Sequence, residues 1–114
     1  MTSCIFCRIA NGEIPATVVY EDAHVVGFRD LNPQAPTHVL VVPRRHIATL
    51  NDLAAGDAEL IGQMYLAAKA VAAADGIAEP GYRTVFNCNA DAGQTVFHLH
   101  LHVLGGRSMD WPPG

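Results

Sequence analysis

The sequence lacks several features that would assign a protein to a class at once. Basic residues are scarce: 7 Lys and Arg stand against 11 Asp and Glu, giving a formal net charge of −4. This balance argues against a general nucleic-acid-binding protein, which needs a basic stripe to neutralise phosphates. No apolar run approaches the roughly 20 residues of a membrane helix. The N-terminus also has no basic region followed by an apolar signal segment. We therefore expect a cytoplasmic protein that binds neither nucleic acid nor membrane.

Cysteine is also scarce, and its 3 occurrences make an odd number. An odd count fits poorly with a disulfide scaffold, and the cytosol would keep the thiols reduced. Cys88 lies alone in an apolar stretch, so we expect it to be a small buried apolar residue. Cys4 and Cys7 form a Cys-x-x-Cys pair, which on a helix places both sulfurs on one face. That spacing suits two metal ligands.

The chain has the length and composition of one compact domain. Apolar residues make up 50% of it, and 114 residues leave no room for a second domain. It contains no internal repeat, low-complexity tract or linker. We therefore expect residues 1–114 to fold as a single domain. Because its core would be modest in size, dimerisation would be a natural source of further burial.

The one long helix is expected over residues 57–75. Apolar residues recur there at three- and four-residue spacing and form a stripe along one face. Met64 and Tyr65 are expected in the core, and Gly76 offers a left-handed cap. The long helix is thus predicted to cover one face of the sheet.

The remaining elements complete an α+β domain with a mainly antiparallel sheet. A short helix is expected over residues 3–10, with Ser3 as its N-cap and Asn11-Gly12 as its stop. The expected strands cover residues 17–20, 24–29, 38–42, 82–88 and 97–104.

Three histidines alternate with leucines in the last expected strand, as His98-Leu99-His100-Leu101-His102. Because side chains alternate across a strand, the three imidazoles would share one face and the leucines would bury the other. The pattern leaves three interpretations open. The histidines could be solvated on an exposed face, they could bind zinc together, or they could act in nucleophilic catalysis.

In the catalytic interpretation a neutral imidazole nitrogen attacks phosphorus while its other nitrogen is held in the right tautomer. Flanking imidazoles would donate hydrogen bonds to the phosphate oxygens. No Lys or Arg occurs from Thr84 to Gly106, so imidazoles, hydroxyls and backbone N–H groups would have to hold a phosphate here. The triplet Gly93-Gln94-Thr95 supplies such groups just before the histidines.

With these residues in view, the chain resembles the histidine triad family, in the branch of histidine triad nucleotide-binding proteins. The motif His98-Leu99-His100-Leu101-His102-Val103-Leu104 carries the resemblance, and the ending Trp111-Pro112-Pro113-Gly114 is particular to that branch. The similarity covers almost the whole chain. Its other segments are residues 5–9, 13–16, 28–30, 33–38, 42–47 and 92–97.

The resemblance implies a five-stranded, mainly antiparallel sheet with one long and one short helix. It also implies a homodimer in which two such sheets join into one ten-stranded sheet. Residues 105–114 would then form a C-terminal tail near the partner's site, with Trp111 contributing to substrate selection. Asp110 stands where some relatives have another polar residue, which puts that tail contact in doubt.

The activity implied is that of a purine nucleoside phosphoramidase, which releases an amine from adenosine or guanosine 5′-phosphoramidates. By the family pattern, His100 attacks the α-phosphorus and forms a nucleotidyl-histidine intermediate, and water then releases the monophosphate. His98 and His102 would stabilise the phosphate oxygens, and His38 would support the triad from the adjoining strand.

The resemblance also assigns nucleotide contacts. Asp30 matches the acceptor of the ribose hydroxyls. Thr95 stands where the family often has Ser, so the hydroxyl is kept but its methyl can alter leaving-group preference. The apolar base pocket matches Phe6, Ile9, Phe28 and Leu31. The phosphate and leaving-group side matches Asn87, Gly93, Gln94 and Thr95.

The Cys4–Cys7 pair predicts one structural zinc per chain. Many bacterial relatives carry zinc on such a pair plus two histidines, which match His46 and His98 here. A metal-free pair of reduced cysteines is the alternative. If His98 binds the metal, it cannot also donate freely to the phosphate, and the chemistry would rest on His100 and His102.

Three other functions stay open at this point. One is hydrolysis of dinucleoside polyphosphates, although the Trp-Pro-Pro-Gly ending favours the phosphoramidase. Another is zinc hydrolase chemistry at the triad, and the third is a non-catalytic, nucleotide-binding adaptor.

Overall fold

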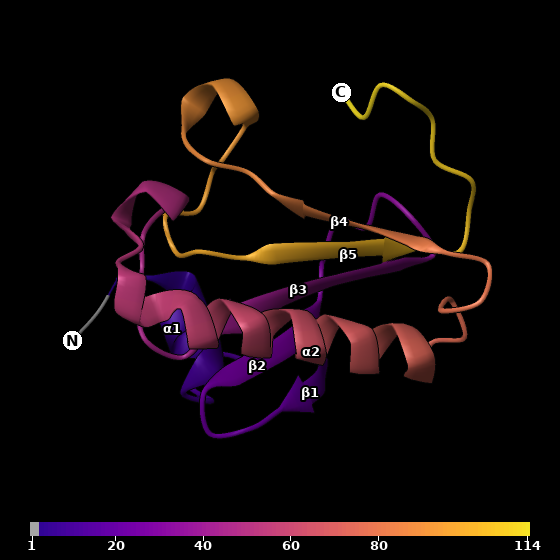
Figure 1. The fold of residues 1–114 in the computed structure, drawn as a ribbon. Coiled ribbons are helices and arrows are strands. Elements are labelled where there is room, and N and C mark those ends of the chain that lie inside the picture. Colours follow the sequence, from indigo (N-terminus) through magenta and orange to yellow (C-terminus); the bar gives the residue numbers. More distant parts are fainter. Residues whose placement is uncertain (1–2) are drawn as a thin grey trace.

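The computed structural model describes residues 3–114, and its ribbon is drawn in Figure 1. Two helices and five strands alternate with three short 3₁₀ turns, at Leu50–Asp52, Ala55–Asp57 and Ala90–Ala92. The elements are α1 (Ile5–Ala10), β1 (Val18–Glu21), β2 (Val25–Arg29), β3 (Thr37–Pro43), α2 (Ala58–Ala74), β4 (Tyr82–Phe86) and β5 (Leu101–Gly105).

The strands form one five-stranded sheet in the order β1-β2-β3-β5-β4, and every neighbouring pair is antiparallel. This confirms the predicted α+β fold, with one long and one short helix. The central strand β3 is buried along its whole length, as expected for an apolar run covered on both faces. No helix within residues 3–114 is long and apolar enough to cross a membrane.

The two helices cover opposite faces of the sheet, and alternate residues of each strand separate two cores. Helix α2 lies across one face (Figure 1) and packs Met64 against Val39, Val41 and Leu101. Helix α1 packs Phe6 on the other face, against Phe28, Leu40 and others. The sheet therefore separates any functional site on the α1 face from the larger core on the α2 face.

Helix α1 begins one residue later than expected. Its N-cap is Cys4 and not Ser3: the backbone of Cys4 is extended, and its Sγ accepts a 3.5 Å hydrogen bond from the Cys7 amide. The predicted stop is confirmed, since Asn11 is the C-cap and Gly12 has a φ of +73°.

Helix α2 agrees with its prediction within a residue at each end, and Gly76 has the expected positive φ of 73°. Met64 is fully buried as predicted, but the expectation for Tyr65 is wrong. Tyr65 lies beside the apolar stripe, is 45% exposed, and meets Phe86 of β4 edge to face. The expectation for Cys88 is also wrong: it lies two residues beyond β4 and is only half-buried.

The last strand is shorter than predicted. It begins at Leu101, so His98 and His100 precede it and only His102 lies within it. The ladder with β3 ends where Leu101 pairs with Val41, because Pro43 has no N–H to extend it. Leu99 instead donates to the carbonyl of Ile47 at 2.6 Å. The inward and outward alternation survives, since Leu99 and Leu101 are both in the α2 core.

Candidate functional site

A pocket of about 270 Å³ opens between α1, the end of β2 and the start of β5. Its walls are mostly apolar, and two imidazoles and one carboxylate converge on it. The residues that line it are Ile5, Phe6, Ile9, Pro15, Ala16, Phe28, Arg29, Asp30, Leu31, Leu40, Thr95, Val96, His100 and His102. This combination is typical of a small-molecule site.

A wider hollow of about 530 Å³ lies near Arg44, Arg45 and Asp57, and none of His98, His100 and His102 lines it. Its cations are already engaged: Arg45 pairs with Asp57, and Arg44 bonds main-chain carbonyls of Ala10 and Asp22. The smaller pocket is therefore the candidate active site.

Hydrogen bonding fixes the tautomer of His100. Its Nδ1 lies 2.8 Å from the carbonyl oxygen of His98, and a carbonyl can only accept, so Nδ1 carries the proton. In the neutral ring Nε2 then keeps its lone pair. Burial lowers the pKa of His100, and the His98 carbonyl opposes that shift only in part. The result is a neutral imidazole with a nucleophilic nitrogen on the pocket wall.

The tautomer of His102 is set from a distance through His38. The amide N–H of Gln34 donates to His38 Nδ1 at 3.0 Å, so in the neutral His38 ring the proton is on Nε2. His38 Nε2–H donates in turn to His102 Nδ1 at 2.9 Å. His102 must therefore carry its own proton on Nε2. His100 offers a lone pair and His102 offers a donor.

His102 Nε2 is also buried and has no hydrogen-bond partner, the one such side-chain atom within the described residues. A buried donor without a partner is costly unless a ligand supplies the acceptor. Burial, followed by the neighbouring His100 and His38, lowers the pKa of His102 to about 4. The ring therefore stays neutral at physiological pH and presents one N–H to the pocket.

Asp30 follows β2 and places its carboxylate at the same pocket. Its Oδ1 accepts from the Asn32 amide at 2.8 Å, and its Oδ2 lies 3.4 Å from His38 Nε2. The carboxylate opposes the effect of burial, which lowers the pKa of His38. Asp30 retains acceptor capacity for hydroxyl groups of a ligand.

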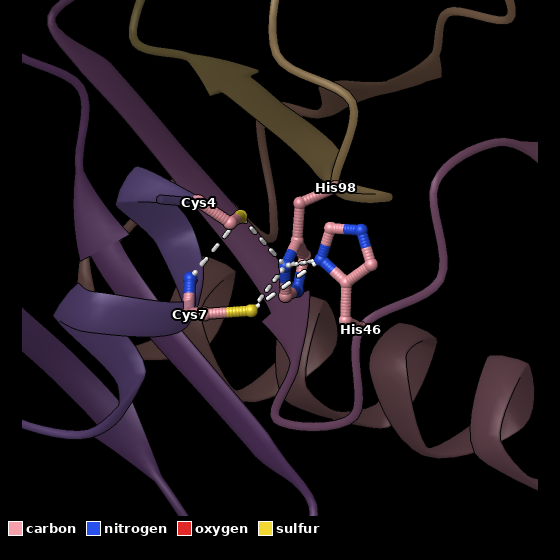
Figure 2. Close-up of side chains that lie close together, drawn as sticks. All are labelled: Cys4, Cys7, His46 and His98. Atoms are coloured by element: carbon pink, nitrogen blue, oxygen red, sulfur yellow. Dashed lines mark hydrogen bonds between the residues drawn. The ribbon is translucent and has the colours of Figure 1, made fainter. Parts of the chain in front are cut away.

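A second cluster adjoins the pocket, and Figure 2 shows its four side chains pointing at one another. Cys4 and Cys7 come from α1, while His46 follows β3 and His98 precedes β5. His98 Nδ1 lies 3.4 Å from each sulfur and 3.2 Å from His46 Nδ1. Donors around a tetrahedral zinc at about 2.0–2.3 Å stand roughly this far apart.

The tautomer of His98 also fits a metal. Its Nε2 lies 2.7 Å from the carbonyl of Pro43 and so carries the proton, which leaves the Nδ1 lone pair facing the two sulfurs and His46. Burial lowers the pKa of His98 and keeps the ring neutral, as a metal ligand requires. The four donors Cys4, Cys7, His46 and His98 could hold one metal ion.

The group of Asp30, His38 and His102 also has metal-ligand spacing, yet its hydrogen bonds do not fit a metal. His38 Nδ1 accepts the Gln34 N–H, so a metal on Nε2 would require loss of both ring protons. This group is a relay of hydrogen bonds, and the Cys-His cluster is the candidate metal site.

A family model described as the HIT domain matches residues 11–109. The chain belongs to the histidine triad (HIT) family. It is 57% identical to a HIT family hydrolase of Legionella pneumophila, with a TM-score of 0.96 over 98% of this chain and 100% of that one. It is 47% identical to the purine nucleoside phosphoramidase of Escherichia coli K12, over 92% of this chain and 88% of that one.

A zinc-bound HIT family protein of Mycobacterium smegmatis is 36% identical, with a TM-score of 0.82 over 96% of this chain and 78% of that one. Two of these similar proteins carry names that state an activity, the hydrolase of Legionella pneumophila and the phosphoramidase of Escherichia coli.

The structure brings some of the predicted HIT site residues together and leaves others apart. Those lining the pocket are Phe6, Ile9, Phe28, Asp30, Leu31, Thr95, His100 and His102. Asn87, Gly93, Gln94 and Trp111 do not line it. Gln94 bonds the main chain at Ala48, Asn89 and Val96, and so shapes the loop beside the pocket. Trp111 is 82% exposed on the C-terminal tail.

Sequence reasoning missed two main-chain groups that set the tautomers. They are the Gln34 amide, which orients His38, and the Pro43 carbonyl, which orients His98. Because they are backbone atoms, no residue type indicates them. The only available signal was position: Gln34 lies in a proline-bounded loop just before His38, and Pro43 ends the central strand.

We expect the protein to lose stability as the pH falls from about 6.5 towards about 4. The pKa of His102 is about 4 in the folded chain and near its ordinary value of 6.5 in the unfolded chain. Between these values the unfolded state binds more protons, so acidification favours unfolding. Urea unfolding at several pH values measures the slope. His102→Gln should flatten it, and His24→Gln, at an exposed histidine, should not. An unchanged slope in His102→Gln would contradict this assignment.

Proposed function

We propose that this protein is a purine nucleoside phosphoramidase, which hydrolyses the P–N bond of adenosine or guanosine 5′-phosphoramidates. The carrying observation is the pair of complementary tautomers in one pocket, the His100 Nε2 lone pair and the His102 Nε2–H donor. The 47% identity to a protein named purine nucleoside phosphoramidase supports the choice of substrate class.

In the first step His100 Nε2 attacks the α-phosphorus. A bond forms between His100 Nε2 and phosphorus while the bond to the amine breaks, and the amine leaves with that bond's electron pair and a proton taken from solvent. The His100 ring becomes positively charged, and the carbonyl of His98 stabilises the charge by accepting the 2.8 Å hydrogen bond from Nδ1–H. Water then attacks the nucleotidyl-histidine and releases the monophosphate.

His102 stabilises the phosphoryl oxygens during both steps. Its Nε2–H is buried and unpartnered, so a phosphoryl oxygen satisfies it at no cost of breaking a bond within the protein. His38 keeps that donor in place through the 2.9 Å bond to Nδ1. His98, whose ring nitrogens face Pro43 and the Cys-His cluster, contributes its carbonyl and not its ring.

The rest of the pocket accommodates the nucleoside. Phe6, Ile9 and Phe28 provide apolar walls for the base, and the 97% exposed Leu31 would be covered when a purine binds beside it. Asp30 accepts from the ribose hydroxyls. Thr95 lines the pocket, and we propose that it forms the leaving-group side together with Asn87, Gly93 and Gln94, which lie outside the pocket wall.

The decisive test compares turnover of an adenosine phosphoramidate with that of a diadenosine polyphosphate. We expect turnover of the phosphoramidate, and at least about a 10³-fold fall in kcat for His100→Asn because the nucleophile is removed. His24→Asn, the same change at an exposed histidine outside the pocket, should keep wild-type kcat.

Three results would reject the proposal. They are a faster turnover of the polyphosphate, equal and negligible rates on both substrates, or a His100→Asn variant as active as the wild type. In the last case, tight monophosphate binding would instead favour a nucleotide-binding adaptor.

We further propose that Cys4, Cys7, His46 and His98 hold one structural zinc per chain. Bound zinc would fix α1 and the segment before β5, and so keep the His98 carbonyl aligned with His100. It supplies no Lewis acid to the substrate in this proposal, because all four positions of a tetrahedral ion would be filled by the protein.

Elemental analysis of untagged protein should give about one zinc per chain. Cys7→Ser should lower the content severalfold and reduce the melting temperature, since a ligand is lost. Cys88→Ser is the matched control, because Cys88 lies outside the cluster, and should keep the metal. A wild-type content well under one zinc per chain would refute the proposal.

A homodimer with a continuous ten-stranded sheet is also proposed. Strand β4 is an edge strand, and Tyr82 on it is 38% exposed. Tyr65 of α2 meets Phe86 of β4 and is 45% exposed, and its neighbour in sequence, Leu66, is 64% exposed. A second copy would cover this edge and these side chains. In the dimer the tail with Trp111 would approach the partner's pocket.

Light scattering should give twice the chain mass of 12.2 kDa. Leu66→Asp, which puts a charge into the proposed contact, should shift the mass towards one chain. Val18→Asp is the control: it puts the same charge on a 44% exposed side chain of the opposite edge strand β1, and it should leave the mass unchanged. A wild-type protein that stays at the mass of one chain at micromolar concentration would disprove the dimer.

A further inference from the structure

The loop before β3 sets the state of the catalytic relay, and its own support comes from the C-terminal end of β5. Gln34 lies in this loop, and its amide N–H donates to His38 Nδ1 at 3.0 Å. A backbone amide can only donate, so this bond excludes a proton from Nδ1 and places it on Nε2 of the neutral ring. If Gln34 moved away, both tautomers of His38 would become accessible.

Gln34 is held from the other side by Arg107. The Arg107 Nε donates to the carbonyl oxygen of Gln34 at 3.1 Å, and its Nη1 donates to the carbonyl of Ser108 at 3.0 Å. Among the described residues, no salt bridge includes Arg107. Its guanidinium is thus committed to main-chain carbonyls and fastens the loop to the end of β5.

A tight steric contact supports the same junction. Gly106 has a φ of +90°, and a Cβ at that position would lie 2.8 Å from Pro36 Cβ. The turn after β5 and the loop before β3 therefore pack without space between them. Two different observations, one a hydrogen bond and one a close approach, hold the Gln34 loop in place.

These contacts form a chain of hydrogen bonds that begins just after β5 and returns to β5. His102 lies in β5, and Arg107 follows two residues after that strand ends. His38 lies in the neighbouring strand β3, where it pairs with Leu104 of β5. The hydrogen bonds run from Arg107 to Gln34, from Gln34 to His38, and from His38 to His102. The same strand thus presents the donor to the pocket and carries its remote support.

We propose that Arg107 is a positioning residue for the proposed reaction: by fixing the Gln34 loop, it keeps His38 in the Nε2–H tautomer and His102 as an Nε2–H donor. Arg107 does not line the pocket and contacts no reacting atom. The inference rests on the proposed function for its kinetic consequence, but the tautomer it predicts belongs to the unliganded protein.

The primary test is the ¹⁵N NMR spectrum of the imidazole rings without substrate, which distinguishes protonated from unprotonated nitrogens. In the wild type, His38 and His102 should each show a single Nε2–H tautomer. In Arg107→Met, which keeps the aliphatic stem and loses the donors, His38 should show a mixture. The kcat of this variant should fall about fivefold, the worth of one ordinary hydrogen bond, with KM changed less than about twofold.

Arg83→Met is the matched control. Arg83 also donates to a tail carbonyl, that of Asp110 at 2.9 Å, but it donates no hydrogen bond to the Gln34 loop. This variant should keep the wild-type tautomers and kcat. If Arg107→Met does not fold, Arg107→Lys carries the same expectation, because it keeps the charge and lacks the Nε donor.

A single Nε2–H tautomer of His38 in a folded Arg107 variant would overturn the proposal, and so would an equal change in Arg83→Met. Failure of the proposed function gives a different result: the wild type would not turn over phosphoramidates, while the ring spectra would still report the relay. A mixed tautomer with unchanged kcat would also overturn the positioning role, because the relay would then have no kinetic effect.

Discussion

The arrangement of the site depends on the placement of one residue, His98. Its ring donates from Nε2 to the Pro43 carbonyl and turns Nδ1 towards Cys4, Cys7 and His46. Its main-chain oxygen accepts from His100. One fully buried residue therefore connects the end of β3, helix α1 and His100. A rotation of this residue would disturb all three, because each of its polar atoms already has a partner.

The pocket contains little fixed positive charge. Arg29 is its one lining cation, and its guanidinium is paired with Asp75 at the end of α2. In the proposed reaction the phosphate would therefore meet the neutral donor His102 and the neutral nucleophile His100, both kept uncharged by burial. Donors of this kind follow charge that develops during the reaction, and they do not hold an anionic product as strongly as an arginine cluster would.

The fold class and the grouping of candidate site residues could be predicted from the sequence, because both leave periodic or local signals. The His-Leu alternation indicated which side chains face the α2 core, and the spacing of Cys4 and Cys7 indicated a shared helix face. Element ends were less predictable. The start of β5 depends on Pro43 in a different strand, and the exposure of Tyr65 depends on which side of α2 meets the sheet.

The residues that set protonation were beyond a reading of side-chain types. The Gln34 amide and the Pro43 carbonyl act as backbone groups, and their effect exists only once the chain is folded. The nucleotide contacts predicted at Asn87 and Trp111 came from family resemblance alone, and those at Gly93 and Gln94 came also from the polar triplet before the histidines. All four residues lie outside the pocket wall of the single chain.

The separation of the two cores by the sheet has a consequence for protein engineering. Residues such as Met64 and Val71 contact only the α2 side, so their repacking can tune thermal tolerance without remodelling the pocket. Phe28 and Leu40 belong to the α1 core and also line the pocket, so substitutions there change thermal stability and ligand binding together. A variant library for new substrates and a variant library for thermal stability can thus be built on opposite faces of the same five-stranded sheet.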